Sequence, residues 1–168
     1  MSEVIVNKVA ESVLVTIDLE EFLPKEKPQI FDLKGYLFKE QILKEKDFRE
    51  ALQITDWDQY KGKNVLIMCS VDAVIPVWAY MLIATNLNLH CNSVFMETEA
   101  LWQKKELINN IRNINTVDFL DKRIVIKGCG EKEIPPEAYF EITKKLQPVA
   151  KSIMYGEPCS TVPVYKKK

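Results

Sequence analysis

The sequence has few of the residues that mark common catalytic and phosphate-binding sites. It contains one histidine, five glycines and no Cys-x-x-Cys pair among its 168 residues. The histidine, His90, is next to Cys91, which is expected at the sheet edge opposite that of Cys159, so a catalytic Cys–His pair with Cys159 is not expected. Gly128-Cys129-Gly130 lacks the further glycine and the Lys-Ser/Thr pair of a phosphate-binding loop.

An excess of charge of one sign and a long hydrophobic run are also absent. The 23 Lys+Arg residues nearly balance the 24 Asp+Glu residues, which excludes the basic footprint of a nucleic-acid-binding protein. The most apolar stretch, from Ala73 to Leu87, contains Pro76 and is shorter than the ~20 residues of a membrane span. No signal-peptide pattern opens the chain. We therefore expect a cytoplasmic protein without a membrane partner, in which the four cysteines stay reduced.

The hydrophobic pattern predicts an α/β fold. Residues 12–19 alternate apolar and polar side chains with the period of a half-buried strand, and residues 31–53 form short, broken helical patterns. After Lys63, strand-like and helix-like segments alternate, which is typical of a mainly parallel sheet with helical crossovers. We expect a single domain over 1–168, with an N-terminal strand and irregular helices (1–60) added to a β/α core (61–168).

Two segments of the predicted core resemble each other. The strand that begins after Lys63 and the strand that begins after Lys122 are each followed by an Ile-Pro-x-x-Ala-Tyr motif. The first motif opens a segment, residues 76–84, that is apolar on nearly every side and is expected to form a buried helix. The second opens a helix expected over residues 136–146. The similarity has two interpretations: a duplicated strand–helix unit, or two unrelated units with the same packing needs.

Three cysteines follow predicted strands. Cys69 and Cys129 come directly after apolar strands that lead into helices, and Cys159 comes shortly after the strand near residues 152–155. Because the carboxyl ends of parallel strands lie at one edge of a sheet, these three thiols are expected to lie close together. Cys91 precedes its strand and is expected at the opposite edge.

A cluster of thiols predicts a metal site for zinc or iron. Three thiolates, Cys69, Cys129 and Cys159, leave a fourth ligand position that Asp72 or Glu157 can fill. Asp18, on the polar face of the first strand, is a weaker candidate. The opposing interpretation is that these cysteines are inert and pack as small hydrophobic side chains.

Cys159 also supports a second class of function. It lies in a turn-forming stretch between Pro158 and Pro163, and loops on a rigid sheet commonly carry function. The protein is therefore either a metal-binding protein, a thiol enzyme or persulfide carrier that uses Cys159, or a non-catalytic interaction module.

Several phrases resemble a bacterial family, mostly from Bacteroidetes, known as domain of unknown function 2480. They are CSVDAVIPVWAYM (69–81), VIKGCG (125–130) and GEPCSTVPVYK (156–166), and residues 6–10 and 16–19 also resemble the opening of the family. The resemblance covers nearly the whole chain and includes three of the four cysteines. It implies an association with iron–sulfur cluster assembly proteins as partners. A cytoplasmic metal-binding protein, accessory to iron–sulfur cluster assembly or sulfur metabolism, is the function we expect.

Overall fold

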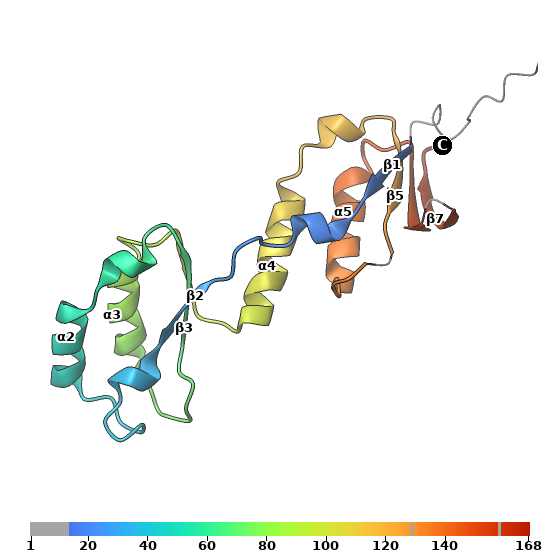
Figure 1. The fold of residues 1–168 in the computed structure, drawn as a ribbon. Helices are drawn as coiled ribbons and strands as arrows, with labels where there is room; N and C mark the ends of the chain where they lie inside the picture. Colours follow the sequence, from blue (N-terminus) through green and yellow to red (C-terminus); the bar gives the residue numbers. More distant parts are fainter. Residues whose placement is uncertain (1–13, 129, 158) are drawn as a thin grey trace, which may run out of the picture. The chain divides into compact units, whose positions relative to one another are not determined.

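The computed structural model describes residues 14–128, 130–157 and 159–168 and forms two compact units. Unit 1 consists of Met1–Pro24 and Lys104–Lys168, and unit 2 consists of Lys25–Gln103. Unit 2 is therefore inserted in the sequence of unit 1, and each unit has its own sheet (Figure 1).

Unit 1 contains a four-stranded sheet of order β1-β5-β6-β7. β1, β5 and β6 are parallel to one another, and β7 pairs with β6 in the antiparallel sense. The elements are β1 (Leu14–Ile17), η1 (Leu19–Phe22), α4 (Glu99–Arg112, which begins in unit 2), η4 (Thr116–Phe119), β5 (Arg123–Ile126), α5 (Pro136–Leu146), β6 (Ser152–Glu157) and β7 (Ser160–Lys166).

Unit 2 contains a three-stranded, fully parallel sheet of order β2-β3-β4. The elements are β2 (Gln29–Asp32), η2 (Leu33–Tyr36), α2 (Glu45–Ile54), η3 (Trp57–Tyr60), β3 (Asn64–Met68), α3 (Val77–Leu87) and β4 (Ser93–Phe95). Each η element is a single turn of 3₁₀ helix.

The two units have the same order of elements and the same core positions. α3 and α5 are each 11 residues long, and each buries an alanine and two aliphatic residues against its sheet. These buried residues are Ala79, Ile83 and Leu87 in α3 and Ala138, Ile142 and Leu146 in α5. The spacing of three to four residues places one face of each helix against the sheet.

The turns of the two units also correspond. Gly62 and Asp121 both have positive φ angles, 69° and 52°. The Gly62 amide donates to the His90 carbonyl (3.2 Å), and the Asp121 amide donates to the Val149 carbonyl (2.9 Å). The helices and turns of the two units therefore correspond, in agreement with the sequence repeat, and the duplication of a strand–helix unit stays a prediction. Among the described residues, β7 has no counterpart in unit 2.

The expected α/β class, with parallel strands and helical crossovers, is confirmed. The expectation that the strands preceding Cys69, Cys129 and Cys159 share one sheet is wrong, because β3 lies in the sheet of unit 2 while β5 and β6 lie in that of unit 1. The alternation of apolar and polar residues identifies a strand in the sequence, but it does not indicate which other strand that strand pairs with. The boundaries of the two units, after Pro24 and after Gln103, differ from the expected division near residue 60. A single domain over the whole chain stays a prediction.

The helix expected over residues 76–84 forms as α3, but its burial on all sides was wrongly predicted. Val77 and Met81 are 74% and 65% exposed, whereas Ala79 and Ile83 are fully buried. A helix on one face of a three-stranded sheet contacts that sheet along one stripe only, so apolar residues outside the stripe stay accessible. None of the helices in the described part of the chain has the length and apolar character needed to span a bilayer.

Candidate functional site

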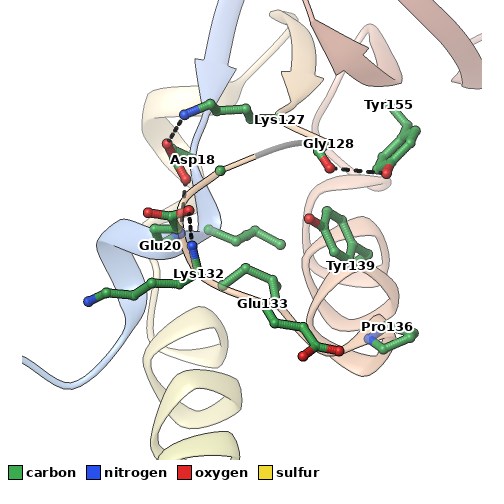
Figure 2. Close-up of a pocket in the computed structure, with 12 residues that line it drawn as sticks. Asp18, Glu20, Lys127, Gly128, Lys132, Glu133, Pro136, Tyr139 and Tyr155 are labelled. Atoms are coloured by element: carbon green, nitrogen blue, oxygen red, sulfur yellow. Dashed lines mark hydrogen bonds and ion pairs between the residues drawn. The ribbon is translucent and has the colours of Figure 1, made fainter.

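A pocket of about 540 Å³ lies in unit 1 at the carboxyl ends of β1 and β5 (Figure 2). Open parallel sheets bind their ligands at this edge, and the volume is that of a metabolite-sized site. The pocket is lined by Asp18, Leu19, Glu20, Lys127, Gly128, Gly130, Lys132, Glu133, Ile134, Pro136, Tyr139 and Tyr155.

Asp18 and Lys127 form an ion pair at one side of this pocket. Asp18 directly follows β1 and caps η1, because its Oδ1 accepts a hydrogen bond from the Glu20 amide at 3.0 Å. Its Oδ2 accepts a hydrogen bond from Nζ of Lys127 at 2.6 Å. The parallel register pairs Ile17 with Ile126, which places the next residue of each strand side by side.

The ion pair shifts the pKa values of both groups. The hydrogen bond from Lys127 lowers the pKa of Asp18, against the opposing effect of desolvation. The same hydrogen bond raises the pKa of Lys127, and the negative charges of Glu157 and Glu20 add to the effect of Asp18. Three carboxylates therefore act on one ammonium group, and the pocket lining itself carries three carboxylates, Asp18, Glu20 and Glu133, against two lysines, Lys127 and Lys132.

Two tyrosines form the other side of the pocket. Tyr139, in α5, and Tyr155, in β6, pack edge to face with ring centroids 5.6 Å apart. The Tyr155 hydroxyl donates a hydrogen bond to the Gly128 carbonyl at 3.3 Å (Figure 2). A Cβ atom at Gly128 would lie 2.8 Å from the Tyr155 ring, so glycine permits this close approach.

Glu20 holds the loop after β5 in place through a hydrogen bond. Its Oε1 accepts a hydrogen bond from the Lys132 amide at 2.9 Å. A side chain at Gly130 would overlap with the Glu20 carboxylate. The two glycines of the Gly128-Cys129-Gly130 stretch thus make room for neighbouring side chains, which explains them without a phosphate-loop function.

The cysteines proposed as metal ligands belong to different units and follow strands of different sheets. Cys69 is half-buried in the loop after β3 of unit 2, and Cys159 is exposed in the turn between β6 and β7 of unit 1. Cys129 lies outside the described residues, between Gly128 and Gly130 in the sequence. Cys91 precedes β4 while Cys69 follows β3, so they belong to opposite ends of the parallel sheet, as expected.

The two acids proposed as the fourth ligand also fall in different units. Asp72 is exposed in the loop between β3 and α3 of unit 2. Glu157 is the last residue of β6 in unit 1, and its charge acts on Lys127. Within the described ranges, His, Cys, Asp and Glu side chains form no group of three or more that is arranged to hold a metal ion.

The sequence interpretation missed Glu20 and Tyr155 as pocket residues and ranked Asp18 as a weak candidate. A signal for Asp18 was available, because Ile17-Asp18-Leu19 matches Phe31-Asp32-Leu33 and each aspartate caps a 3₁₀ helix. The pairing of Asp18 with Lys127, 109 residues away, has no such signal.

Comparison with curated proteins and with solved structures finds no match. The chain does match the sequence profile of a family described as "Protein of unknown function (DUF2480)", over residues 3–167. The match covers nearly the whole chain and includes both units, in agreement with the resemblance noted in the sequence. The chain therefore belongs to the DUF2480 family.

Proposed function

We propose that the pocket of unit 1 binds a small polar molecule that carries an amino group. The observation that carries this proposal is the Asp18–Lys127 ion pair within a pocket at the carboxyl ends of parallel strands. A few convergent polar groups with shifted pKa values in a pocket of this size are typical of a ligand-binding site.

The charges around Lys127 indicate which ligands suit the pocket. Asp18, Glu20 and Glu157 all act on this single ammonium group, so the local excess of negative charge favours a cationic ligand over a phosphate. The rings of Tyr139 and Tyr155 offer an aromatic surface for the cationic or aliphatic part of such a ligand.

Thermal unfolding with simple probes tests this proposal. Putrescine, ethanolamine and L-lysine serve as amine probes, and inorganic phosphate and AMP serve as anionic probes. We expect at least one amine to raise the unfolding midpoint and the anions to leave it unchanged, because a ligand that binds only the folded state stabilises it. Asp18→Asn should abolish the shift. Asp32→Asn, at the equivalent cap in unit 2, is the matched control. A shift produced only by the anions would contradict the proposal.

A divalent cation, zinc or iron(II), is the second candidate ligand of unit 1. The position of Glu157 favours it, since this carboxylate acts on the same lysine as Asp18, and Cys159 follows two residues later. Glu157 and Cys159 are the described members of the expected ligand set that belong to unit 1, Cys129 lies outside the described residues, and Asp18 is the weaker candidate. Cys69 and Asp72 belong to unit 2, and their part in the ligand set stays a prediction. Such a site would support the cytoplasmic role in iron–sulfur or sulfur metabolism expected from the sequence.

Lys127 provides a direct test of the metal candidate. A metal ion would compete with the Lys127 ammonium for the Asp18 carboxylate, so Lys127→Gln should increase zinc affinity. Lys151→Gln is the control, because Lys151 is an exposed lysine of unit 1 that does not line the pocket. Protein isolated under reducing, chelator-free conditions should contain near-stoichiometric zinc or iron. Elemental analysis without a transition metal, together with an unfolding midpoint unchanged by added zinc or iron(II), would exclude this candidate.

Cys159 distinguishes the two remaining alternatives. A thiol enzyme or persulfide carrier requires Cys159 to be modified rapidly near neutral pH, and its exposure in the β6–β7 turn favours access. An interaction module would show neither bound metal nor preferential modification of Cys159.

A further inference from the structure

Unit 2 has a pocket at the same edge of its own sheet. The pocket has a volume of about 560 Å³ and lies at the carboxyl ends of β2, β3 and β4. It is lined by Ile30, Leu66, Ile67, Met68, Cys69, Tyr80, Met96, Glu97, Thr98 and Glu99. Tyr80 corresponds to Tyr139, since each follows the buried alanine of its helix by one residue.

The two units carry different side chains at the carboxyl ends of their parallel strands. In unit 1, Lys127 and Gly128 follow the last strand residue Ile126, whereas in unit 2 Met68 and Cys69 follow the corresponding Ile67. Met96, directly after β4, adds a second thioether to the lining. Three sulfur-bearing side chains therefore border one pocket whose remaining strand residues are aliphatic.

We propose that this pocket binds copper(I) through the thiolate of Cys69 and the thioethers of Met68 and Met96. Soft sulfur ligands select copper(I), while zinc prefers thiolate, imidazole and carboxylate ligands in a tetrahedral shell. The pocket offers three sulfur ligands, which suit copper(I), and no imidazole; the carboxylates of Glu97 and Glu99 also line it, so zinc is the competing ion in the test. Binding releases the thiol proton of Cys69 and involves no change of oxidation state.

The surroundings of Cys69 suit such a site. The thiol is half-buried, which limits access by water while leaving a path for the ion. The Tyr80 side chain lines the same pocket as Cys69. Met68 and Met96 are 40% and 61% exposed, so their flexible side chains are free to turn toward an ion.

Protection of Cys69 from alkylation tests the site in the full-length protein. Copper(I), supplied anaerobically as its acetonitrile complex and buffered with bathocuproine disulfonate, is added before iodoacetamide, and each cysteine is quantified by mass spectrometry. We expect one equivalent of copper(I) to protect Cys69, with equimolar zinc giving little protection. The double variant Met68→Leu/Met96→Leu should bind copper(I) at least ~10-fold more weakly, since even the loss of an outer-shell partner costs that much.

Met81→Leu is the matched control, because Met81 is an exposed methionine of α3 that does not line the pocket. Three results would each overturn the proposal. They are no protection of Cys69 by copper(I), equal protection of Cys69 in the double methionine variant, and equal protection of Cys69 by zinc. Copper found only at Cys91, Cys129 or Cys159 would also overturn it. The residues tested belong to unit 2, so the result is independent of the ligand proposed for unit 1.

Discussion

Asp18 and Asp32 hold the same position in the two units but bind different partners. Asp18 directly follows β1, and Asp32 is the last residue of β2. Each accepts a hydrogen bond from the amide two residues later, at 3.0 Å for Asp18 and 2.9 Å for Asp32. Asp18 also accepts from Nζ of Lys127, whereas Asp32 accepts from the amide and hydroxyl of Ser70 at 3.0 Å and 2.6 Å. Two units with corresponding elements thus support a charged pocket in unit 1 and a sulfur-lined pocket in unit 2.

The ion pair in unit 1 predicts a defined pH dependence of stability. The pKa of Asp18 is lowered from 3.8 in the folded protein, so its contribution is complete above the unfolded pKa and is lost as the pH falls through the lowered folded pKa. The pKa of Lys127 is raised from 10.5, so its contribution is lost as the pH rises through the raised value.

Urea unfolding of the wild type and Asp18→Asn checks this expectation. The difference in free energy of unfolding should stay constant between about pH 5 and pH 9 and shrink below about pH 4. Asp118→Asn, an exposed aspartate of η4, is the control. A difference that persists unchanged to pH 2 would contradict the role of the Asp18 charge.

The hydrophobic cores of the two units predict that equivalent large-to-small substitutions lower the free energy of unfolding by similar amounts. Ile83 and Ile142 are fully buried in separate hydrophobic clusters. Replacing either by alanine should lower the free energy of unfolding by about 2–5 kcal/mol, while Val77→Ala on the exposed side of α3 should change it by less than about 0.5 kcal/mol. Hydrogen exchange should accelerate mainly in the unit that carries the cavity, and equal acceleration in both units would contradict the separate cores.

The Gly130 position predicts a local effect on the loop after β5. An added methyl group overlaps with the Glu20 carboxylate, so Gly130→Ala should displace Glu20 and weaken its hydrogen bond to the Lys132 amide. We expect a loss of about 1–3 kcal/mol in the free energy of unfolding, the usual cost of a lost bond to a charged group. Gly35→Ala is the control, since a Cβ there meets no atom within 4 Å. Equal effects of the two substitutions would argue against this contact.

The environments of the cysteines predict an order of modification. Cys159 is exposed, whereas Cys91 is half-buried and burial raises the pKa of its thiol. Iodoacetamide near neutral pH should therefore modify Cys159 well before Cys91, because the thiolate is the reacting species. Mass spectrometry at short reaction times measures both rates. Cys159→Ser should leave the unfolding midpoint unchanged, and faster modification of Cys91 would reverse the assignment.

Most of the elements after Lys63 and the repeat were predictable from the sequence, whereas the strands β2 (Gln29–Asp32) and β7 (Ser160–Lys166) were not expected. The bounds of α5 follow from Pro136 at its first turn and the loss of helical pattern before Pro148. The repeated Ile-Pro-x-x-Ala-Tyr motif marks the two equivalent helices, because each needs a small residue at its closest approach to the sheet. Local periodicity and capping depend on residues near one another in the chain, so the sequence by itself determined these elements.

The tertiary structure alone decided which strands share a sheet. β3 and β5 have similar apolar patterns, yet β3 pairs with β2 and β4 while β5 pairs with β1 and β6. This division assigns Cys69 and Cys159 to different sheets, and the pairing of β1 with β5 brings Asp18 to Lys127. Hydrophobic burial drives each strand into a sheet but is non-directional, so the partner depends on how the whole chain packs.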